Sequence, residues 1–261
     1  MNRAASSYRK LVANPVYYLR VAAHVLVRMR DPLRTLSRFF FLSPVPALTF
    51  RNGLHITTPR PADVHTFITI FFHHVYGDVG TGKTIIDIGA NIGLFALYAA
   101  HDKDNSVYAF EPSPANWETL KRNVEANASR ARITIVNQGV RAARGTFPMA
   151  AELGPSSRIY RDGEQPVPGE TPALVECITL QDIFDRWGIG TCDLLKIDCE
   201  GCEYEILFSA PDSLLDRIRE IRMECHPLDD QRDRRTMERF LRAKGYAITY
   251  AKGWILFARR D

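Results

Sequence analysis

The chain has 261 residues, and its 34 Lys and Arg against 30 Asp and Glu give a net charge of +4, too small by itself to indicate a nucleic-acid-binding protein. Its composition, 46% hydrophobic and 25% charged, is typical of a globular protein, and its five cysteines, an odd number, do not fit a secreted disulfide framework. No signal peptide is evident and no apolar run approaches about 18 residues, so we predict a cytoplasmic chain with no membrane-spanning helix.

Residues 1–44 are predicted to form a helical extension. The first 40 residues carry eight Lys and Arg against one acid, Asp31. Within them, 15–40 interleaves apolar and basic residues, which predicts one or two amphipathic helices broken near Asp31-Pro32. The preferred interpretation is a helical cap that packs on the core. The alternative is a peripheral contact with a membrane surface or a partner.

Residues 45–261 are predicted to form one α/β domain. Strand-like pieces and the apolar run 67–76 come first. From Thr84 onward, short β-branched runs alternate with helical stretches, which indicates parallel strands joined by crossover helices. The stretch 141–178 is rich in Gly and Pro and is predicted to be an insertion with a hairpin or edge strands. Two closing strands, separated by Lys252-Gly253, predict a tight antiparallel hairpin.

The run 77–93 satisfies a Walker A pattern in its first half, with Gly77, Gly82, Lys83 and Thr84 in place. A phosphate loop needs a strand before it and a helix that begins at its Gly-Lys-Thr. The apolar run before it could supply the strand. The sequence after it, TIIDIG, is β-branched and soon reaches a glycine, so it is poor helix material. A P-loop ATPase is therefore the disfavoured alternative.

The second half of the same run predicts a cofactor turn. TIIDI reads as a buried strand, and Gly89, Asn91 and Gly93 suit the tight turn that follows it. Glu111 ends the next strand, 22 residues after Gly89, where an acid is placed to accept the hydroxyls of a ribose. Asp87 would repel a pyrophosphate but suits the sulfonium and amine of S-adenosylmethionine. These charges favour a methyl donor over a dinucleotide.

Three motifs follow one another along the predicted alternation of strands and helices. They are Asp87-x-Gly89-x-Asn91-x-Gly93, Glu111-Pro112-x-Pro114-x-Asn116-x-x-x-Leu120-x-x-Asn123 and Lys196-Ile197-Asp198-x-Glu200-Gly201-x-Glu203.

Between about residues 85 and 226, the chain thereby resembles the FkbM family of S-adenosylmethionine-dependent methyltransferases. The resemblance implies a class I methyltransferase fold, with a seven-stranded Rossmann-like sheet whose last strand is antiparallel. It also implies methyl transfer, usually to a hydroxyl oxygen of a sugar, glycan, polyketide or other secondary metabolite. Pro112 and Tyr76 are predicted to join the residues of the cofactor site.

The catalytic residues are expected at the carboxyl ends of the strands, where open α/β sheets bind their ligands. An aliphatic hydroxyl needs a general base or a metal to take its proton. Asp198, Glu200 and His226 are the candidates for the base, and the sequence does not choose among them. Lys196 would orient a carboxylate or bind an anionic substrate, and Glu224 would hold His226 or the substrate. Asp198, Glu200 and Glu224 could together hold Mg²⁺, but their spacing demands no metal.

The remaining expectations concern partners. Ser156, Ser157 and Arg158 in the insertion are predicted to recognise the acceptor. Cys199-x-x-Cys202 with Cys225-His226 invites a zinc interpretation, although small buried thiols are the simpler account. A nucleic-acid acceptor is not expected, because no Asn/Asp-Pro-Pro-Tyr/Phe motif is present to grip a flipped base. A non-catalytic scaffold that binds a nucleoside stays open as a further alternative.

Overall fold

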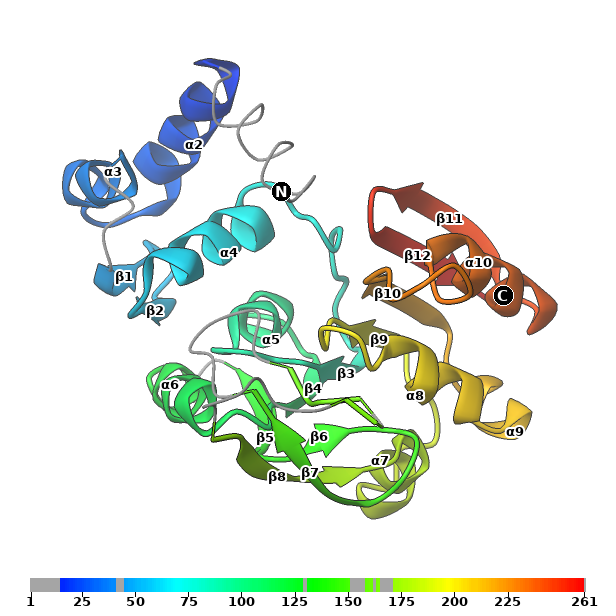
Figure 1. Cartoon of the computed structure of the whole chain (residues 1–261). Coiled ribbons are helices and arrows are strands. Elements are labelled where there is room, and N and C mark those ends of the chain that lie inside the picture. The colour runs from blue at the N-terminus through cyan, green and yellow to red at the C-terminus, as the bar shows by residue number, and fades with distance from the viewer. Residues whose placement is uncertain are drawn as a thin grey trace. The chain divides into compact units, whose positions relative to one another are not determined.

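The structure is a computed structural model that describes residues 15–40, 45–128, 131–150, 158–161, 163–164 and 171–260. The chain divides into two compact units, Met1–Val75 and Tyr76–Asp261 (Figure 1). Ser156 and Ser157, predicted to recognise the acceptor, lie outside the described residues.

In its described residues, 15–40 and 45–75, the first unit contains three helices and a strand pair. Helices α2 (Pro15–Arg28) and α3 (Pro32–Phe40) are followed by the antiparallel strands β1 (Val45–Thr49) and β2 (His55–Thr58), and then by α4 (Pro61–Phe71). The predicted break near Asp31-Pro32 is confirmed. Proline cannot donate the hydrogen bond that an unbroken helix would need there, but it is well suited to the first turn of a new helix.

Aromatic rings form the core of this unit. Phe67 on α4 lies within 4.9–5.8 Å, centroid to centroid, of the rings of Phe39, Phe50, Phe71 and Phe72. Such tilted, edge-on and stacked pairs add to the free energy that burial of the rings already supplies. The apolar run before the Walker-like residues begins in α4 and leaves the helix after Phe71, and its phenylalanines Phe71 and Phe72 both pack against Phe67.

Helices α2 and α3 also present apolar side chains to solvent. Leu19, Leu26, Val27 and Leu33 are between 50% and 78% exposed. In the described part of the chain, no helix combines the length and the apolar composition needed to cross a bilayer. Peripheral membrane contact through these helices stays a prediction.

The second unit is built on a seven-stranded sheet with the order β11-β12-β10-β9-β3-β4-β5. The last strand, β12, pairs antiparallel with both of its neighbours, and the other pairs are parallel. This confirms the predicted α/β sheet with an antiparallel last strand. The strands are β3 (Thr84–Ile88), β4 (Ser106–Phe110), β5 (Arg132–Val136), β9 (Leu194–Ile197), β10 (Glu220–Glu224), β11 (Ala247–Lys252) and β12 (Ile255–Arg259).

The closing hairpin differs from its prediction by one residue. Lys252 belongs to β11 and pairs with Ile255, so the two-residue turn is Gly253-Trp254. Gly253 has a φ of 59°, in the left-handed region that two-residue hairpin turns use.

Helices cover both faces of the sheet (Figure 1). From β3 the chain moves toward β5 through α5 (Leu94–Ala100) and α6 (Pro114–Glu125), whereas from β9 it moves the opposite way through α8 (Glu203–Ser209). Because such crossovers are right-handed, the two sets of helices lie on opposite faces. On the α8 face, α7 (Leu180–Arg186) and α10 (Arg234–Ala243) join the same buried cluster. The four-residue α9 (Asp212–Leu215) was not predicted.

The insertion contributes a small separate sheet. Strands β6 (Gly139–Val140), β7 (Gly145–Met149) and β8 (Ala173–Ile178) are ordered β6-β8-β7, and β7 pairs antiparallel with β8. The two strand-like ends predicted for the insertion are therefore confirmed. Val140, Met149 and Cys177 attach this sheet to the buried cluster of the main sheet.

The Walker A interpretation is wrong. Residues 77–83 form a loop, and Thr84 begins β3 rather than a helix. The Lys83 N–H donates to Asn105 Oδ1 at 2.8 Å, and the carbonyl of Lys83 accepts from the Ser106 N–H. The element before the loop is α4, not a strand. The run therefore lacks the helix N-terminus that a phosphate loop uses.

Candidate active site

The turn after β3 depends on its glycines. Gly89, Asn91 and Gly93 have φ angles of 75°, 52° and 85°, all in the left-handed region. A Cβ on Gly89 would lie 1.8 Å from the carbonyl oxygen of Asp198, and one on Gly93 would lie 2.5 Å from Leu120 Cδ1. Glycine thus lets the end of β3 approach the end of β9 and lets α6 pack closely.

Glu111, at the end of β4, fastens this turn. Its carboxylate accepts from the Asn91 N–H at 2.7 Å and from the Ser113 N–H at 2.9 Å. Burial raises the pKa of Glu111, and these N–H groups act in the opposite direction. Pro112 follows directly, and Asn137 Nδ2 donates to the carbonyls of Glu111 and Pro112 at 2.8 and 3.3 Å. The Glu111 side chain therefore joins the turn to β4 at one edge of the sheet.

Asp87 and Lys196 form a buried pair beneath the turn. Lys196 Nζ lies 3.0 Å from Asp87 Oδ1 and donates to the carbonyl of Gly89 at 2.8 Å. Burial lowers the pKa of Lys196, but the Asp87 and Asp198 carboxylates outweigh it and the net shift is upward. Burial also raises the pKa of Asp87, with the Lys196 cation opposing the shift. We expect Lys196 to stay charged and to hold the end of β3.

Tyr76 links this pair to the acids at the ends of β9 and β10. Its hydroxyl donates to Asp198 Oδ2 at 2.7 Å and lies 3.4 Å from Glu224 Oε1. Burial, and then the Asp198 and Glu224 carboxylates, raise the pKa of Tyr76 well above its usual value. The phenol therefore stays protonated and remains a donor.

His226 lies among three carboxylates. Its Nδ1 is 2.7 Å from Glu203 Oε1, and its Nε2 is 3.4 Å from Glu200 Oε2 and 3.6 Å from Glu224 Oε2. Burial would lower the pKa of His226, but the Glu203 hydrogen bond and the surrounding carboxylates raise it to about 10. His226 is thus an imidazolium at neutral pH, with both ring nitrogens acting as donors.

Glu200 and Glu224 titrate near neutrality. Burial is the largest cause for both, and it raises each pKa to about 7 although His226 opposes the shift. Each carboxylate therefore exchanges a proton in the range where a general base is most effective.

The loop that carries Glu200 is conformationally unusual. Glu200 has a φ of 56°, which is uncommon for a residue with a side chain, and Gly201 has a φ of 119°. The fully buried carboxylate of Glu203 accepts from the Gly201 N–H at 3.2 Å and the Cys199 N–H at 3.4 Å. Backbone strain of this kind collects at functional sites, where the surrounding structure holds it.

The sequence that forms this site matches a known protein family. The model of the family described as the methyltransferase FkbM domain matches residues 87–248, which is more than half of the chain. The chain belongs to the FkbM methyltransferase domain family. The matched range begins at Asp87 and includes the strand ends that carry Glu111, Asp198 and His226.

Curated relatives of this methyltransferase are distant. The methyltransferase sdnD of Sordaria araneosa is 27% identical over 69% of this chain and 80% of its own length. The 31-O-demethyl-FK506 methyltransferase FkbM of Streptomyces tacrolimicus is 28% identical over 57% of this chain and 67% of its own. The hexuronic acid methyltransferase AglP of Haloferax volcanii is 26% identical over 56% of this chain and 57% of its own.

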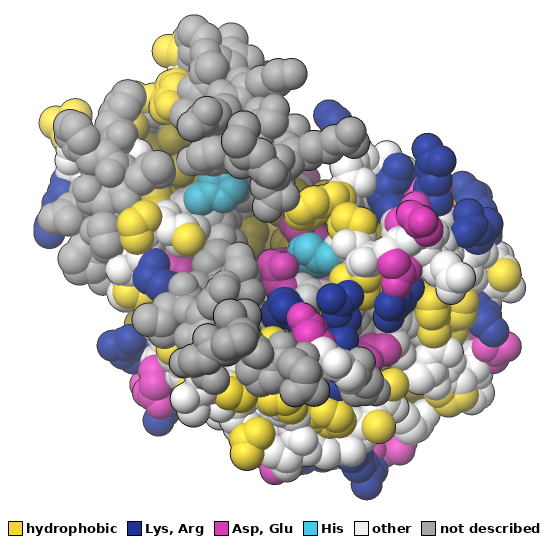
Figure 2. Space-filling view, in the orientation of Figure 1, with side chains coloured by type: hydrophobic (Ala, Val, Ile, Leu, Met, Phe, Trp, Pro, Cys, Tyr) yellow, Lys and Arg dark blue, Asp and Glu magenta, His cyan; other side chains and the backbone are white. Residues whose placement is uncertain are grey.

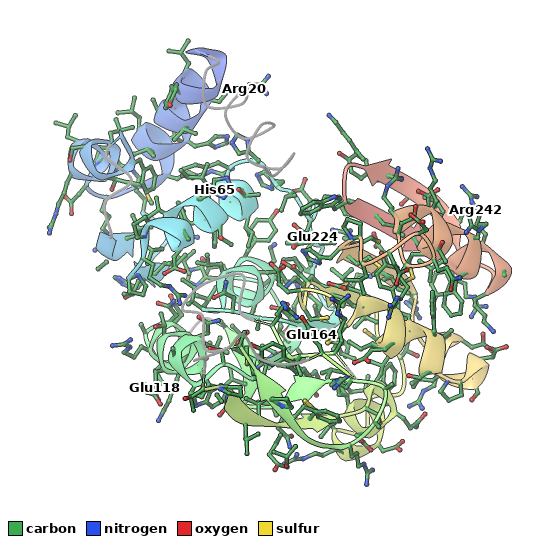
Figure 3. The ribbon with its side chains drawn as sticks, viewed as in Figure 1. Arg20, His65, Glu118, Glu164, Glu224 and Arg242 are labelled. Carbon is green, nitrogen blue, oxygen red and sulfur yellow. The ribbon has the colours of Figure 1, made fainter. Side chains whose placement is uncertain are left out.

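Most of the predicted site residues of the methyltransferase converge at the carboxyl edge of the sheet, where Glu224 ends β10 (Figure 3). One group surrounds the turn after β3, and the other surrounds His226, with Tyr76 and Lys196 joining the two. Their individual roles stay predictions. Arg158, in the insertion, is paired with Glu164 at 2.5–2.7 Å.

Glu203 was not among the predicted site residues. The signal for it was present, because it is the second acid of the Glu200-Gly201-x-Glu203 motif and opens α8. What sequence could not supply was its direction: the side chain turns back to the loop and to His226 rather than to solvent.

The cluster also contains a candidate set of metal ligands. Asp198, Glu224 and His226 each carry one potential ligand atom, and these atoms lie within 4.8 Å of one another. His226 would have to lose its proton to serve as a ligand. The set differs from the one considered from sequence, because His226 takes the place of Glu200. No described cysteine belongs to it; Cys202 is buried, and Cys199 contacts Cys202.

Proposed function

We propose that the chain binds S-adenosylmethionine at the turn after β3 and transfers its methyl group to a hydroxyl oxygen. The observation that supports this most directly is a set of buried acceptor atoms. Asp87 Oδ2 and Asn91 Oδ1 are buried, and no described residue donates to either. Buried acceptors of this kind call for a partner, and the amine and hydroxyl donors of a cationic nucleoside suit them.

The acceptor side of the proposal rests on the carboxylates. S-adenosylmethionine, when bound, supplies an electrophilic methyl on a sulfonium. Among the described residues, Glu200 forms an ion pair with His226 and no hydrogen bond or ion pair with another side chain, whereas Glu224 lies near both His226 and Tyr76. We assign Glu200 as the base that takes the hydroxyl proton. Asp198 and Glu224, held by Tyr76, would position the acceptor hydroxyl by accepting hydrogen bonds.

An oxygen acceptor agrees with the names of two relatives. One is named for a 31-O-demethyl substrate and another for a hexuronic acid. The cluster around Glu200 can remove a proton from a neutral hydroxyl, which a more acidic nucleophile would not require. We therefore propose a sugar, glycan or secondary metabolite that carries a free hydroxyl.

Transfer of a labelled methyl group tests the function. The purified chain is incubated with methyl-labelled S-adenosylmethionine and separate fractions of glycans, lipids and small metabolites, with Glu200→Ala as the blank. Label in a hydroxyl-bearing product, absent from the blank, is expected. Binding of the cofactor with no transfer to any fraction would favour the scaffold alternative. A parallel reaction with EDTA shows whether Asp198, Glu224 and His226 act through a divalent cation.

Glu111→Ala is expected to weaken S-adenosylmethionine binding by about tenfold or more. A buried carboxylate that accepts from ligand hydroxyls contributes roughly 1.5–3 kcal/mol. Calorimetric titration measures the change. Glu118→Ala is the matched control, because Glu118 is exposed on the outer side of α6, away from Glu224 (Figure 3). Equal affinity of the wild-type protein and Glu111→Ala would rule out the ribose contact.

The rate is expected to rise with pH through an apparent pKa near 7. A base works only after it has lost its proton, and burial has raised the pKa of both Glu200 and Glu224 to about 7. The two acids interact, so the midpoint belongs to the pair rather than to either residue. A pH profile of kcat/KM measures it. An acid limb below about pH 5, where an ordinary glutamate titrates, would contradict the assignment.

A further inference from the structure

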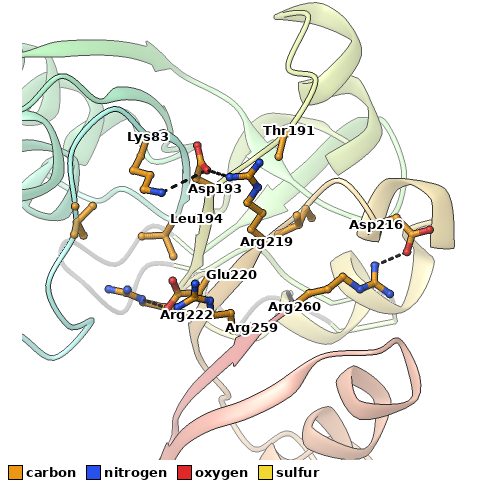
Figure 4. A pocket seen from close by; sticks show the side chains of 13 residues that line it. Lys83, Thr191, Asp193, Leu194, Asp216, Arg219, Glu220, Arg222, Arg259 and Arg260 are labelled. Carbon is orange, nitrogen blue, oxygen red and sulfur yellow. Dashed lines mark hydrogen bonds and ion pairs between the residues drawn. The ribbon is translucent and has the colours of Figure 1, made fainter.

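A cavity lies at the opposite end of the main sheet from the proposed active site. Its volume is about 650 Å³, and it is formed where β3, β9 and β10 begin and where β12 ends (Figure 4). Because the cofactor turn and the His226 cluster lie at the carboxyl ends of the parallel strands, this cavity is separate from the proposed active site. We call it the basic edge pocket.

The charge of the basic edge pocket is unbalanced. Its lining holds three acids, Asp193, Asp216 and Glu220, and five basic residues, which are Lys83, Arg219, Arg222, Arg259 and Arg260. Two of the cations share one carboxylate: Asp193 Oδ1 lies 3.7 Å from Lys83 Nζ and 3.1 Å from Arg219 Nη1. Arg259 has neither a hydrogen bond nor an ion pair from its guanidinium to any described residue.

One of these cations is fixed in place by the fold. Arg222 is only 12% exposed; it donates to the carbonyls of Tyr76 and Asp78 at 2.5 and 2.8 Å and to Glu220 Oε1 at 2.7 Å. A guanidinium held in this way loses little conformational freedom when it meets a ligand. The pocket therefore combines a fixed arginine, Arg222, with an exposed arginine, Arg259, whose charge no described carboxylate neutralises.

The Walker-like run supplies one wall of this pocket. Val79, Gly80 and Lys83 line it. The run does not cradle a phosphate with a helix N-terminus, as the loop conformation shows, but it brings Lys83 to a cluster of arginines. Guanidinium groups bind phosphate oxygens through paired hydrogen bonds, and a lysine adds a point charge.

We propose that the basic edge pocket binds a phosphate-bearing small molecule. The excess of positive charge matches a dianionic phosphate, and the volume, which falls in the range of ordinary ligand pockets, is larger than one phosphate requires. An organic phosphate, with the phosphate on Arg219 and Arg259, fits both properties. The same group occurs on soluble metabolites and on lipid headgroups, and we expect the soluble form.

Calorimetric titration with uridine 5′-diphosphate tests the proposal. The probe lacks adenine, and saturating S-adenosylhomocysteine is kept in the cell so that the proposed cofactor site cannot contribute. Saturable binding is expected, and Arg259→Glu and Arg219→Glu should each weaken it by at least tenfold. Basic side chains also gather in the region of α10 (Figure 2), where exposed Arg235 provides the matched control Arg235→Glu. That variant should bind like the wild-type protein.

Three results would overturn the proposal. They are no saturable binding, equal weakening by the Arg235→Glu control, and binding that appears only when S-adenosylhomocysteine is left out. Flotation with vesicles of phosphatidylcholine, with and without phosphatidic acid, identifies the source of the phosphate. Association with phosphatidic acid that is lost in Arg259→Glu would assign the pocket to a lipid headgroup. Thermal unfolding of each variant confirms that the fold is retained.

Discussion

Glu200→Gln is expected to lower kcat by roughly 10²- to 10⁴-fold while the affinity for S-adenosylmethionine changes little. The amide keeps the size of the side chain but cannot accept the hydroxyl proton. Burial places the pKa of Glu200 at about 7, and its carboxylate lies 3.4 Å from His226, which Glu203 holds in one orientation. Single-turnover rates with a confirmed acceptor, together with calorimetric cofactor binding, separate the two effects.

Glu224→Gln, compared with Glu200→Gln, shows which of the two glutamates is the base. Glu224 also titrates near 7, but it contacts Tyr76 as well as His226, so it is expected to position the acceptor. Its replacement should raise KM more than it lowers kcat. A kcat that falls in Glu224→Gln and stays within about twofold of wild type in Glu200→Gln would transfer the role of base to Glu224.

Gly89→Ala is expected to destabilise the fold by roughly 2–5 kcal/mol. The left-handed φ of 75° disfavours any side chain, and the added Cβ would lie 1.8 Å from the Asp198 carbonyl oxygen. That oxygen is backbone, so relief requires the ends of β3 and β9 to separate. Urea denaturation measures the loss, and the cofactor affinity should fall with it because the turn carries Asn91.

Gly82→Ala provides the matched control from the same run of sequence. Gly82 has a φ of 67°, close to that of Gly89, but a Cβ there would meet nothing within 4 Å. Only the backbone cost of roughly 1–2 kcal/mol should remain. If the two alanine variants lose equal stability, then the close approach of β3 and β9 does not constrain Gly89.

The α/β sheet could be predicted because its signals are local. Short β-branched strands, helices between them and glycines at the turns are each visible within about ten residues of sequence. The same locality explains the Walker A match. Residues 77–84 match the Walker A sequence motif. Only the β-branched residues that follow indicate a strand rather than the helix of a phosphate loop.

The site required information that local patterns lack. His226 and Glu203 are 23 positions apart, and only the packing of α8 against the end of β10 brings their side chains to 2.7 Å. Asp87 was expected to face the cofactor's positive charge, and local sequence did not show that its carboxylate also pairs with Lys196 from the neighbouring strand. The basic edge pocket is likewise assembled from loops and strand ends that are far apart in the chain.

Equilibrium binding of S-adenosylmethionine to the purified chain tests the central claim most directly. The account predicts saturable one-site binding that S-adenosylhomocysteine displaces, that Glu111→Ala weakens by about tenfold or more and that Glu118→Ala leaves unchanged. Absence of binding, or binding that is indifferent to Glu111, would contradict a cofactor site at the turn after β3.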